Sequence, residues 1–130
     1  NLGITGVMTA SSYVGDGSGL SGISVGLETA SQTVTNSICT LNLSKQDHHL
    51  ILAGITTLSC QNGTAGDSHT VRIVNSGITT VLFDNYFLWP SGGVPSIPTT
   101  SGAISLISFT VHNVGAAGTQ LLAGAAVDFS

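Results

Sequence analysis

Four histidines are the residues in this chain best suited to metal binding or acid–base chemistry: His48, His49, His69 and His112. His48 and His49 are adjacent, so on a strand they point to opposite faces and cannot bind one ion within a subunit. No pair of histidines or cysteines has the spacing of zinc ligands. In a trimer, three copies of His48 or His112 could meet at the axis; otherwise the histidines are exposed or hydrogen-bonded. We expect no metal and no cofactor.

The acidic residues do not form a catalytic group. Asp16 lies in the glycine-rich run 15–19, but an EF-hand loop needs further carboxylates, so we expect a turn-forming aspartate. Gly17, Gly19 and Gly22 match a dinucleotide fingerprint only in spacing, because no strand–turn–helix context surrounds them. Nothing connects Ser, His and Asp into a triad, and a glycan hydrolase would need two acids close together. We therefore expect no catalytic residue and no enzyme.

The aromatic-rich loop at residues 84–95 carries the strongest candidates for ligand binding. At the exposed tip of a domain, rings in this loop would stack on the faces of sugars while neighbouring polar side chains donate or accept hydrogen bonds. Large aromatic residues are more often buried, so the alternative is that they fill the core or a subunit interface. The candidate ligand-binding residues are Asp84, Asn85, Tyr86, Phe87 and Trp89.

The composition limits the possible partners. Of 130 residues, 42% are hydrophobic but only 6% are charged, against about 25% charged in a typical soluble domain. Much of the surface must therefore be Ser, Thr, Asn and Gly, or be buried between subunits. A net charge of −4 with two basic residues argues against binding to nucleic acid or to anionic membranes. No apolar run is long enough for a transmembrane helix.

Hydrophobic alternation predicts β-strands from residue 28 onward. No segment keeps a helical period over three turns, whereas several short runs alternate and are separated by Gly, Asn and Pro. We expect about eight strands in an antiparallel β-sandwich, jelly-roll-like in class. The expected strands include residues 33–44 (broken once), 48–53, 56–60, 69–75, 79–83, 103–112 and 119–129.

Two cysteines allow one disulfide, and two asparagines lie in glycosylation sequons. Cys39 and Cys60 both lie on inward faces and could meet if their strands pair directly, but not if segment 48–53 separates them. The sequence leaves both arrangements open. Asn42 and Asn62 fit the sequon, which matters only in a eukaryotic host.

Residues 1–27 form a glycine-rich segment that we expect to be a stalk or docking arm. Closely spaced glycines rule out a helix and favour a series of tight turns. The segment carries more apolar side chains than a flexible linker should expose, although a linker remains the alternative. We expect its side chains Tyr13, Val14, Leu20 and Ile23 to contact neighbouring subunits.

Residues 3–23 resemble the repeat unit of tail-fibre and other virion-appendage proteins of tailed phages, which is most familiar from phages of marine cyanobacteria. Segments 33–42, 53–59, 71–77, 88–95 and 103–111 resemble the β-rich domain that often caps phage tail fibres. The chain departs from that pattern at Ser105, where Asp is usual, and at residues 114–118. The resemblance implies a homotrimeric appendage on the virion surface that contacts other virion proteins.

The predicted function is adhesion. Residues 1–27 would form the stalk, and residues 28–130 would form a tip that binds a host-surface glycan through several weak contacts. The alternative is a purely structural capsid decoration protein or a self-assembling extracellular filament subunit with no ligand.

Overall fold

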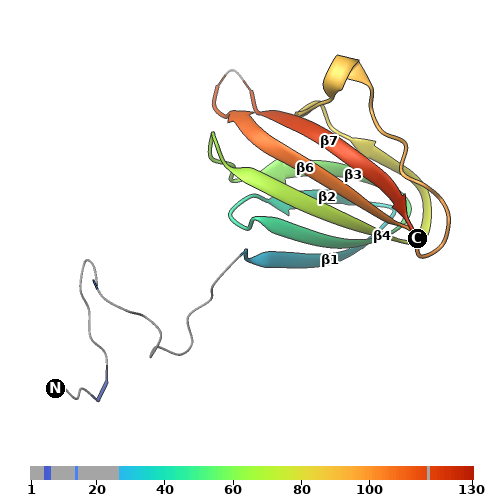
Figure 1. The fold of residues 1–130 in the computed structure, drawn as a ribbon, viewed down its shortest axis with the longest axis horizontal. Helices are drawn as coiled ribbons and strands as arrows, with labels where there is room; N and C mark the ends of the chain where they lie inside the picture. Colours follow the sequence, from blue (N-terminus) through green and yellow to red (C-terminus); the bar gives the residue numbers. More distant parts are fainter. Residues whose placement is uncertain (1–4, 7–13, 15–26, 117) are drawn as a thin grey trace.

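The computed structural model describes residues 5–6, 14, 27–116 and 118–130. It confirms an all-β, sandwich-like fold (Figure 1). In order along the chain, the elements are β1 (Thr29–Thr35), β2 (Ile38–Asn42), β3 (Asp47–Gln61), β4 (Ser68–Phe83), β5 (Phe87–Leu88), a short 3₁₀ helix η1 (Pro90–Gly92), β6 (Ile104–Asn113) and β7 (Gln120–Phe129).

The strand pairing differs from the antiparallel arrangement expected throughout. β6 is antiparallel to both β4 and β7, as expected. In contrast, β3 runs parallel to β1, β2 and β4, and β5 runs parallel to β7. The sheet order is β1-β3-β4-β6-β7-β5, and β2 pairs with the second half of β3. Alternation in the sequence identifies which side chains face inward but not the direction of the neighbouring strand.

Short connections between parallel strands require the long strands to bend. A straight strand of 15 residues such as β3 would extend about 50 Å. The connection 62–67 spans at most about 25 Å, yet it leads from the end of β3 to the start of its parallel neighbour β4. β3 therefore bends near Gly54, where the register with β4 shifts twice. Expected strands 48–53 and 56–60 are thus one bent strand.

Segments 29–42, 47–61 and 68–83 are three similar passes that lie side by side. The first part of each pass lies in the front layer, which contains β1 and the first halves of β3 and β4. The chain then turns, and the second part lies in the back layer, which contains β2 and the second halves of β3 and β4 (Figure 1). At the turns, Asn36 (φ 50°), Gly54 (φ 67°) and Gly77 (φ 118°) have positive φ angles. Glycine and asparagine adopt this conformation most readily. The expected break in strand 33–44 is this first turn, between β1 and β2.

Asparagine side chains hold these turns together. The Ile55 amide donates to Asn36 Oδ1 at 3.2 Å, and the Asn36 amide donates to the Ala53 carbonyl. In the third pass, Asn75 Oδ1 accepts hydrogen bonds from the amides of Gly77 and Ile78 at 2.7 and 2.6 Å. Each bond satisfies a backbone donor that the sheet ladder leaves unpaired at the bend.

The core lies between the two layers. It is formed by inward-facing aliphatic side chains from the long strands, together with a group of aromatic rings to which the segment 84–97 contributes Phe87 and Trp89. Its fully buried members include Leu41, Leu50, Leu52, Leu58, Val71, Ile73, Ile107, Val111 and Leu121.

Replacing Gly54 with Ala should destabilise the domain by about 3 kcal/mol, through positive-φ strain and loss of the Asn36 hydrogen bond. A Cβ at Gly54 would lie 2.0 Å from Asn36 Oδ1, whereas one at Gly66, also at positive φ, would meet nothing within 4 Å. Gly66→Ala is therefore the matched control and should cost about 1 kcal/mol. Urea unfolding measures both changes, and equal costs would contradict the close approach of Asn36.

Candidate functional site

The aromatic-rich loop contributes to the core rather than to an exposed stacking surface. Phe87 is 5% exposed and Trp89 is 9% exposed. Their ring centroids lie 5.3 and 4.9 Å from that of Phe83, in edge-to-face arrangements, and Phe87 also meets Phe109 at 5.7 Å. Phe87 and Trp89 are therefore mostly buried against the core, as in the alternative that these aromatics fill the core, although Trp89 also lines a surface depression of about 310 Å³.

The remaining residues of this candidate site form a tight turn. The Tyr86 amide donates to Asp84 Oδ1 at 2.9 Å, so this carboxylate supports the turn. The Tyr86 carbonyl accepts a hydrogen bond from the Leu121 amide at 2.8 Å, which ties the loop to β7. Tyr86 is half-buried against the core, and Asn85 is exposed. Of the five predicted ligand-binding residues, only Asn85 is exposed.

Three of the four predicted assembly residues, Tyr13, Leu20 and Ile23, lie outside the residues that the structure describes. The fourth, Val14, is fully exposed.

Two histidines form a buried pair. The rings of His48 and His69 are 6.0 Å apart, and His69 also stacks on Phe109 at 5.2 Å. His69 Nδ1 is 2.9 Å from the Lys45 carbonyl, while Nε2 of each histidine has no hydrogen-bond partner among the described residues. Burial, with repulsion from His69, lowers the pKa of His48. His48 is 1% exposed and therefore cannot supply a ligand at a symmetry axis.

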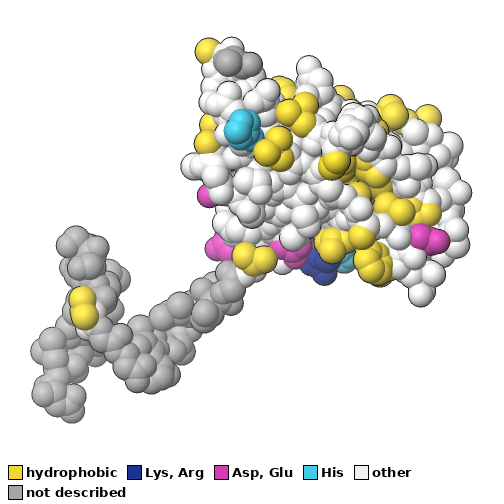
Figure 2. All heavy atoms as spheres, turned by 45° about the horizontal axis from the view of Figure 1, so that its top comes forward, with side chains coloured by type: hydrophobic (Ala, Val, Ile, Leu, Met, Phe, Trp, Pro, Cys, Tyr) yellow, Lys and Arg dark blue, Asp and Glu magenta, His cyan; other side chains and the backbone are white. Residues whose placement is uncertain are grey.

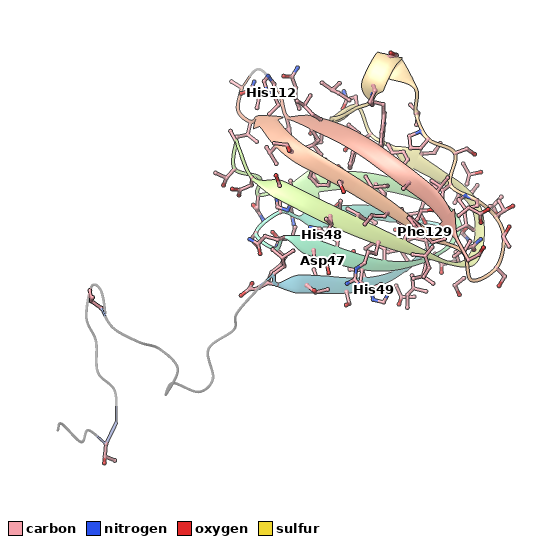
Figure 3. The ribbon with its side chains drawn as sticks, viewed as in Figure 1. Asp47, His48, His49, His112 and Phe129 are labelled. Atoms are coloured by element: carbon pink, nitrogen blue, oxygen red, sulfur yellow. The ribbon has the colours of Figure 1, made fainter. Side chains whose placement is uncertain are left out.

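The other two histidines are separate from this pair. His49 is half-buried and His112 is exposed. Figure 3 shows His112 well away from both His48 and His49. Over residues 27–116 and 118–130, no three His, Cys, Asp or Glu side chains gather as a metal site would require.

Both cysteines are free thiols. β2 and β3 pair directly, but Cys39 lies opposite Leu58 and Cys60 lies opposite Leu41. This offset of two residues puts the two Cα atoms about 8 Å apart, given strand spacing of about 4.8 Å and rise of about 3.3 Å, which is too far for a disulfide. Burial raises the pKa of both thiols to about 11, with Asp84 adding to the effect at Cys60. Neither thiol is an activated nucleophile.

Asp47 joins three strands on the outer face of the front layer. Its carboxylate accepts hydrogen bonds from Thr29 on β1 at 2.9 Å and from Thr70 on β4 at 3.0 Å. Arg72 on β4 donates from Nε and Nη2, at 3.2 and 2.5 Å. Burial alone would raise the pKa of Asp47, but these hydrogen bonds and the Arg72 charge lower it. The arrangement is structural, because all four donors come from the sheet itself.

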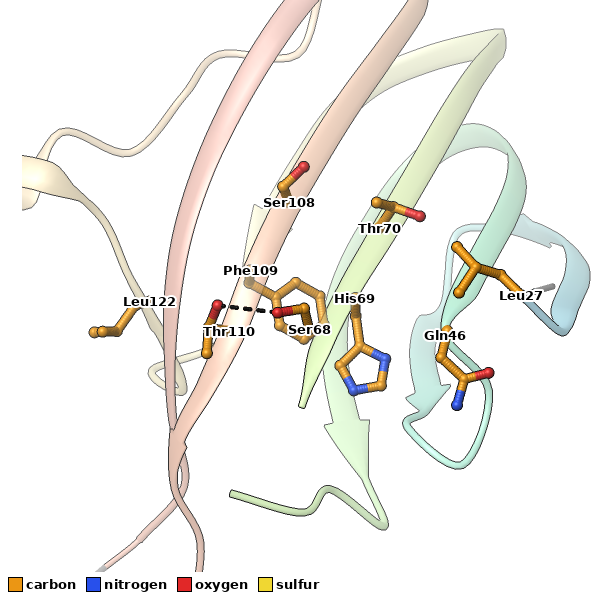
Figure 4. Close-up of a pocket in the computed structure, with 9 residues that line it drawn as sticks. All are labelled: Leu27, Gln46, Ser68, His69, Thr70, Ser108, Phe109, Thr110 and Leu122. Atoms are coloured by element: carbon orange, nitrogen blue, oxygen red, sulfur yellow. Dashed lines mark hydrogen bonds between the residues drawn. The ribbon is translucent and has the colours of Figure 1, made fainter. Parts of the chain in front are cut away.

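Two surface depressions lie at opposite ends of the domain, one near the start of β1 and the other near the turn that follows β1. The first, about 410 Å³, has a floor that includes Ser68, Thr70, Ser108 and Thr110 and is flanked by Leu27 and Leu122 (Figure 4). It lies at the end of the domain where the N-terminal segment enters β1.

The second depression, about 360 Å³, lies at the turn end of the domain. Leu27 and Asn36 flank the two ends of β1, so this depression is distal to the N-terminal segment. Its lining is uncharged and consists of Asn36, Ser37, Ile38, Ile55 and Thr57. Ile38 and Ile55 are 66% and 52% exposed, so the depression offers aliphatic surface beside amide and hydroxyl groups.

Comparison with known proteins gives no match to a family model, to a curated protein or to a solved structure. The described residues also include no helix with the length and apolar character needed to span a bilayer.

Acidification should destabilise the domain in two steps. The unfolded chain protonates His48 near its usual pKa of about 6.5, whereas the folded state holds it neutral, so stability falls as pH drops from about 7 to 5. Asp47 has a lowered folded pKa, so its contribution is present above about pH 4 and lost as pH falls through that folded value.

His48→Leu separates the two steps. This variant should show a smaller stability loss between pH 7 and 5 but the same loss below pH 4. Asp47→Asn should cost about 2 kcal/mol at pH 7, because Arg72 is half-exposed and solvent screens the pair. Urea unfolding at several pH values measures both variants, and an unchanged loss from pH 7 to 5 in His48→Leu would refute the first assignment.

Proposed function

We propose that this chain is a structural subunit of a tailed-phage virion appendage, homotrimeric, whose folded domain adheres to a host-surface glycan. The observation that carries the proposal is the combination of a nearly uncharged surface with many exposed aliphatic side chains. Only eight of 130 residues are charged. Figure 2 shows hydrophobic side chains spread over one face, with few charged side chains among them. Such a surface suits contact with neutral partners or with other subunits.

The resemblance of residues 3–23 to the appendage repeat supports the same proposal, since such repeats are found in proteins that assemble on virions. The polarity of the domain is consistent with it. The N-terminal segment enters β1 at one end, and the turns at Asn36, Gly54 and Gly77 lie at the other. A tip bound to a stalk needs this separation between its attached end and its contact end.

The distal depression is the proposed contact for the glycan, in place of the buried aromatic rings. Neutral sugars present hydroxyl groups and apolar C–H faces together. Ser37 and Thr57 supply hydroxyls, and Ile38 supplies an exposed aliphatic surface. One such contact is weak, and three copies on one fibre would add up by avidity.

Glycan binding by the full 130-residue chain tests this proposal. Light scattering should give three times the chain mass of 13.1 kDa, and an array of bacterial surface polysaccharides should show binding by this oligomer. Ile38→Asp should lower the apparent affinity at least tenfold, because it places a charge in the depression. Val94→Asp is the matched control, since Val94 is 62% exposed on a different loop.

A monomeric mass would contradict the homotrimer. An oligomer that binds no glycan would favour the other candidate, a purely structural decoration protein or filament subunit. The exposed aliphatic surface suits that candidate equally well, because it needs contacts between subunits and no ligand.

A further inference from the structure

β7 has an unpaired edge over most of its length. On one side it pairs with β6, and on the other it pairs with β5 only at Leu121 and Leu122. Among the described residues, no strand pairs with the rest of this edge. An open edge of this kind presents a row of backbone hydrogen-bonding groups with which another extended chain can pair in place of water.

The hydrogen bonds of β7 show which residues face the open edge. The Leu121 amide donates toward β5, to the Tyr86 carbonyl at 2.8 Å. Because backbone groups alternate along a strand, the amides of Ala123, Ala125 and Val127 also point to the open side. Every residue from Gly124 to Phe129 is exposed, on both faces of the strand.

Exposed apolar side chains concentrate around this edge. Ile104, Leu122, Leu88, Val127 and Phe129 all lie on β7 or on its two partners, and each is 40–51% exposed. No charged residue occurs from 120 to 127. Natural edge strands usually carry charges, prolines or bulges that prevent pairing. On the unpaired part of β7 such features are confined to the last residues, where Asp128 has a positive φ of 64° and the register with β6 shifts.

Among the residues that the structure describes, the opposite edge of the sheet, on β1, is also unpaired, and the strand carries no charged residue. The Glu28 carbonyl accepts amides from the start of β3, and the Asn36 amide donates to Ala53 of β3. By alternation, Thr29, Ser31, Thr33 and Thr35 direct their backbone groups away from β3. The two edges also match in side chains, since Ala30 and Val34 on β1 have the spacing of Ala123 and Val127 on β7, with all four inward-facing.

We propose that the β7 edge of one subunit pairs in parallel with the β1 edge of a second copy of this chain, closing a ring of three. Opposite Ala123, Ala125 and Val127 would lie Ala30, Gln32 and Val34. In this register, the backbone N–H and C=O groups on the open edge of β7 face those on the open edge of β1. The exposed inner face of Val127 would then continue the half-buried inner face of Val34.

Strand direction favours this heterologous contact over pairing of β7 with another β7. Within one subunit, β1 and β7 run in the same direction. A ring of parallel contacts therefore keeps all three subunits in one orientation, with the three N-terminal segments entering at one end. A two-fold β7–β7 contact would place those segments at opposite ends. This argument rests on the proposed function, in which three chains share a stalk.

Cross-linking tests the pairing in the full-length chain. Thr33→Cys and Ala126→Cys lie opposite each other in the proposed register, on exposed outer faces. Within one subunit they are four strand spacings apart, about 19 Å, so only an intermolecular bond can form. Mild oxidation of the double variant should give a covalent trimer on a non-reducing gel.

The single variants are the controls. Thr33→Cys alone should give no cross-link, and a covalent dimer from Ala126→Cys alone would show β7–β7 pairing and overturn the proposal. A ladder beyond three would show the same edges in an open filament and overturn the closed ring. An oligomer without any cross-link would overturn the edge pairing while leaving the homotrimeric appendage intact. A monomer would contradict both.

A proline tests the edge by a second route. Ala125→Pro removes an amide that points to the open edge and leaves the β6 ladder intact, and proline is tolerated at such positions. It should weaken subunit association at least tenfold by analytical ultracentrifugation, whereas Ala125→Thr, which keeps the amide, should change it less than threefold. Equal association in the two variants, with circular dichroism confirming the fold, would overturn the proposal.

Discussion

The structure depends on one backbone constraint: the chain must reverse direction in the middle of each of the segments 29–42, 47–61 and 68–83, and all three reversals lie at the same end of the domain. Asn36, Gly54 and Gly77 make these reversals with positive φ angles, and the absence of a side chain on Gly54 lets Asn36 Oδ1 reach the Ile55 amide. Parallel strands ordinarily need a crossover of a dozen or more residues. Bending each strand back into a second layer removes that need, so connections of four and six residues are sufficient.

Most of the interior of this domain is apolar. Most inward positions on the three passes and on β6 and β7 are aliphatic or aromatic, and the two cysteines among them have raised pKa values. The buried polar exceptions are His48, Thr56, His69, Asn75 and Ser105. The Asp47 carboxylate accepts hydrogen bonds from Thr29, Thr70 and Arg72, and these bonds connect β3 to β1 and β4. The proposed function accordingly uses surfaces, and the surface has unusual features at the strand edges and at the turn end.

Much of the fold could be predicted from the sequence, but the pairing could not. Alternation identified the strands because each has one buried face, and it does not encode the direction of a partner. Gly54 lies between the expected strands 48–53 and 56–60, so alternation predicts two strands there, although the structure has one strand that bends at Gly54. For the candidate site, Phe87 and Trp89 flank the exposed Leu88, and this two-residue period indicates a strand with both rings inward. Pro90 and the following glycines made the segment resemble an exposed loop instead.

The polarity of the domain links its fold to its proposed role. The chain enters at the start of β1, and the turns lie at the far end of the same strand. Both features result from the path of the three passes and do not depend on a ligand. A subunit built this way has one end committed to the preceding segment and the other end free. When copies share one orientation, their free ends face the same way, and weak contacts at those ends act together.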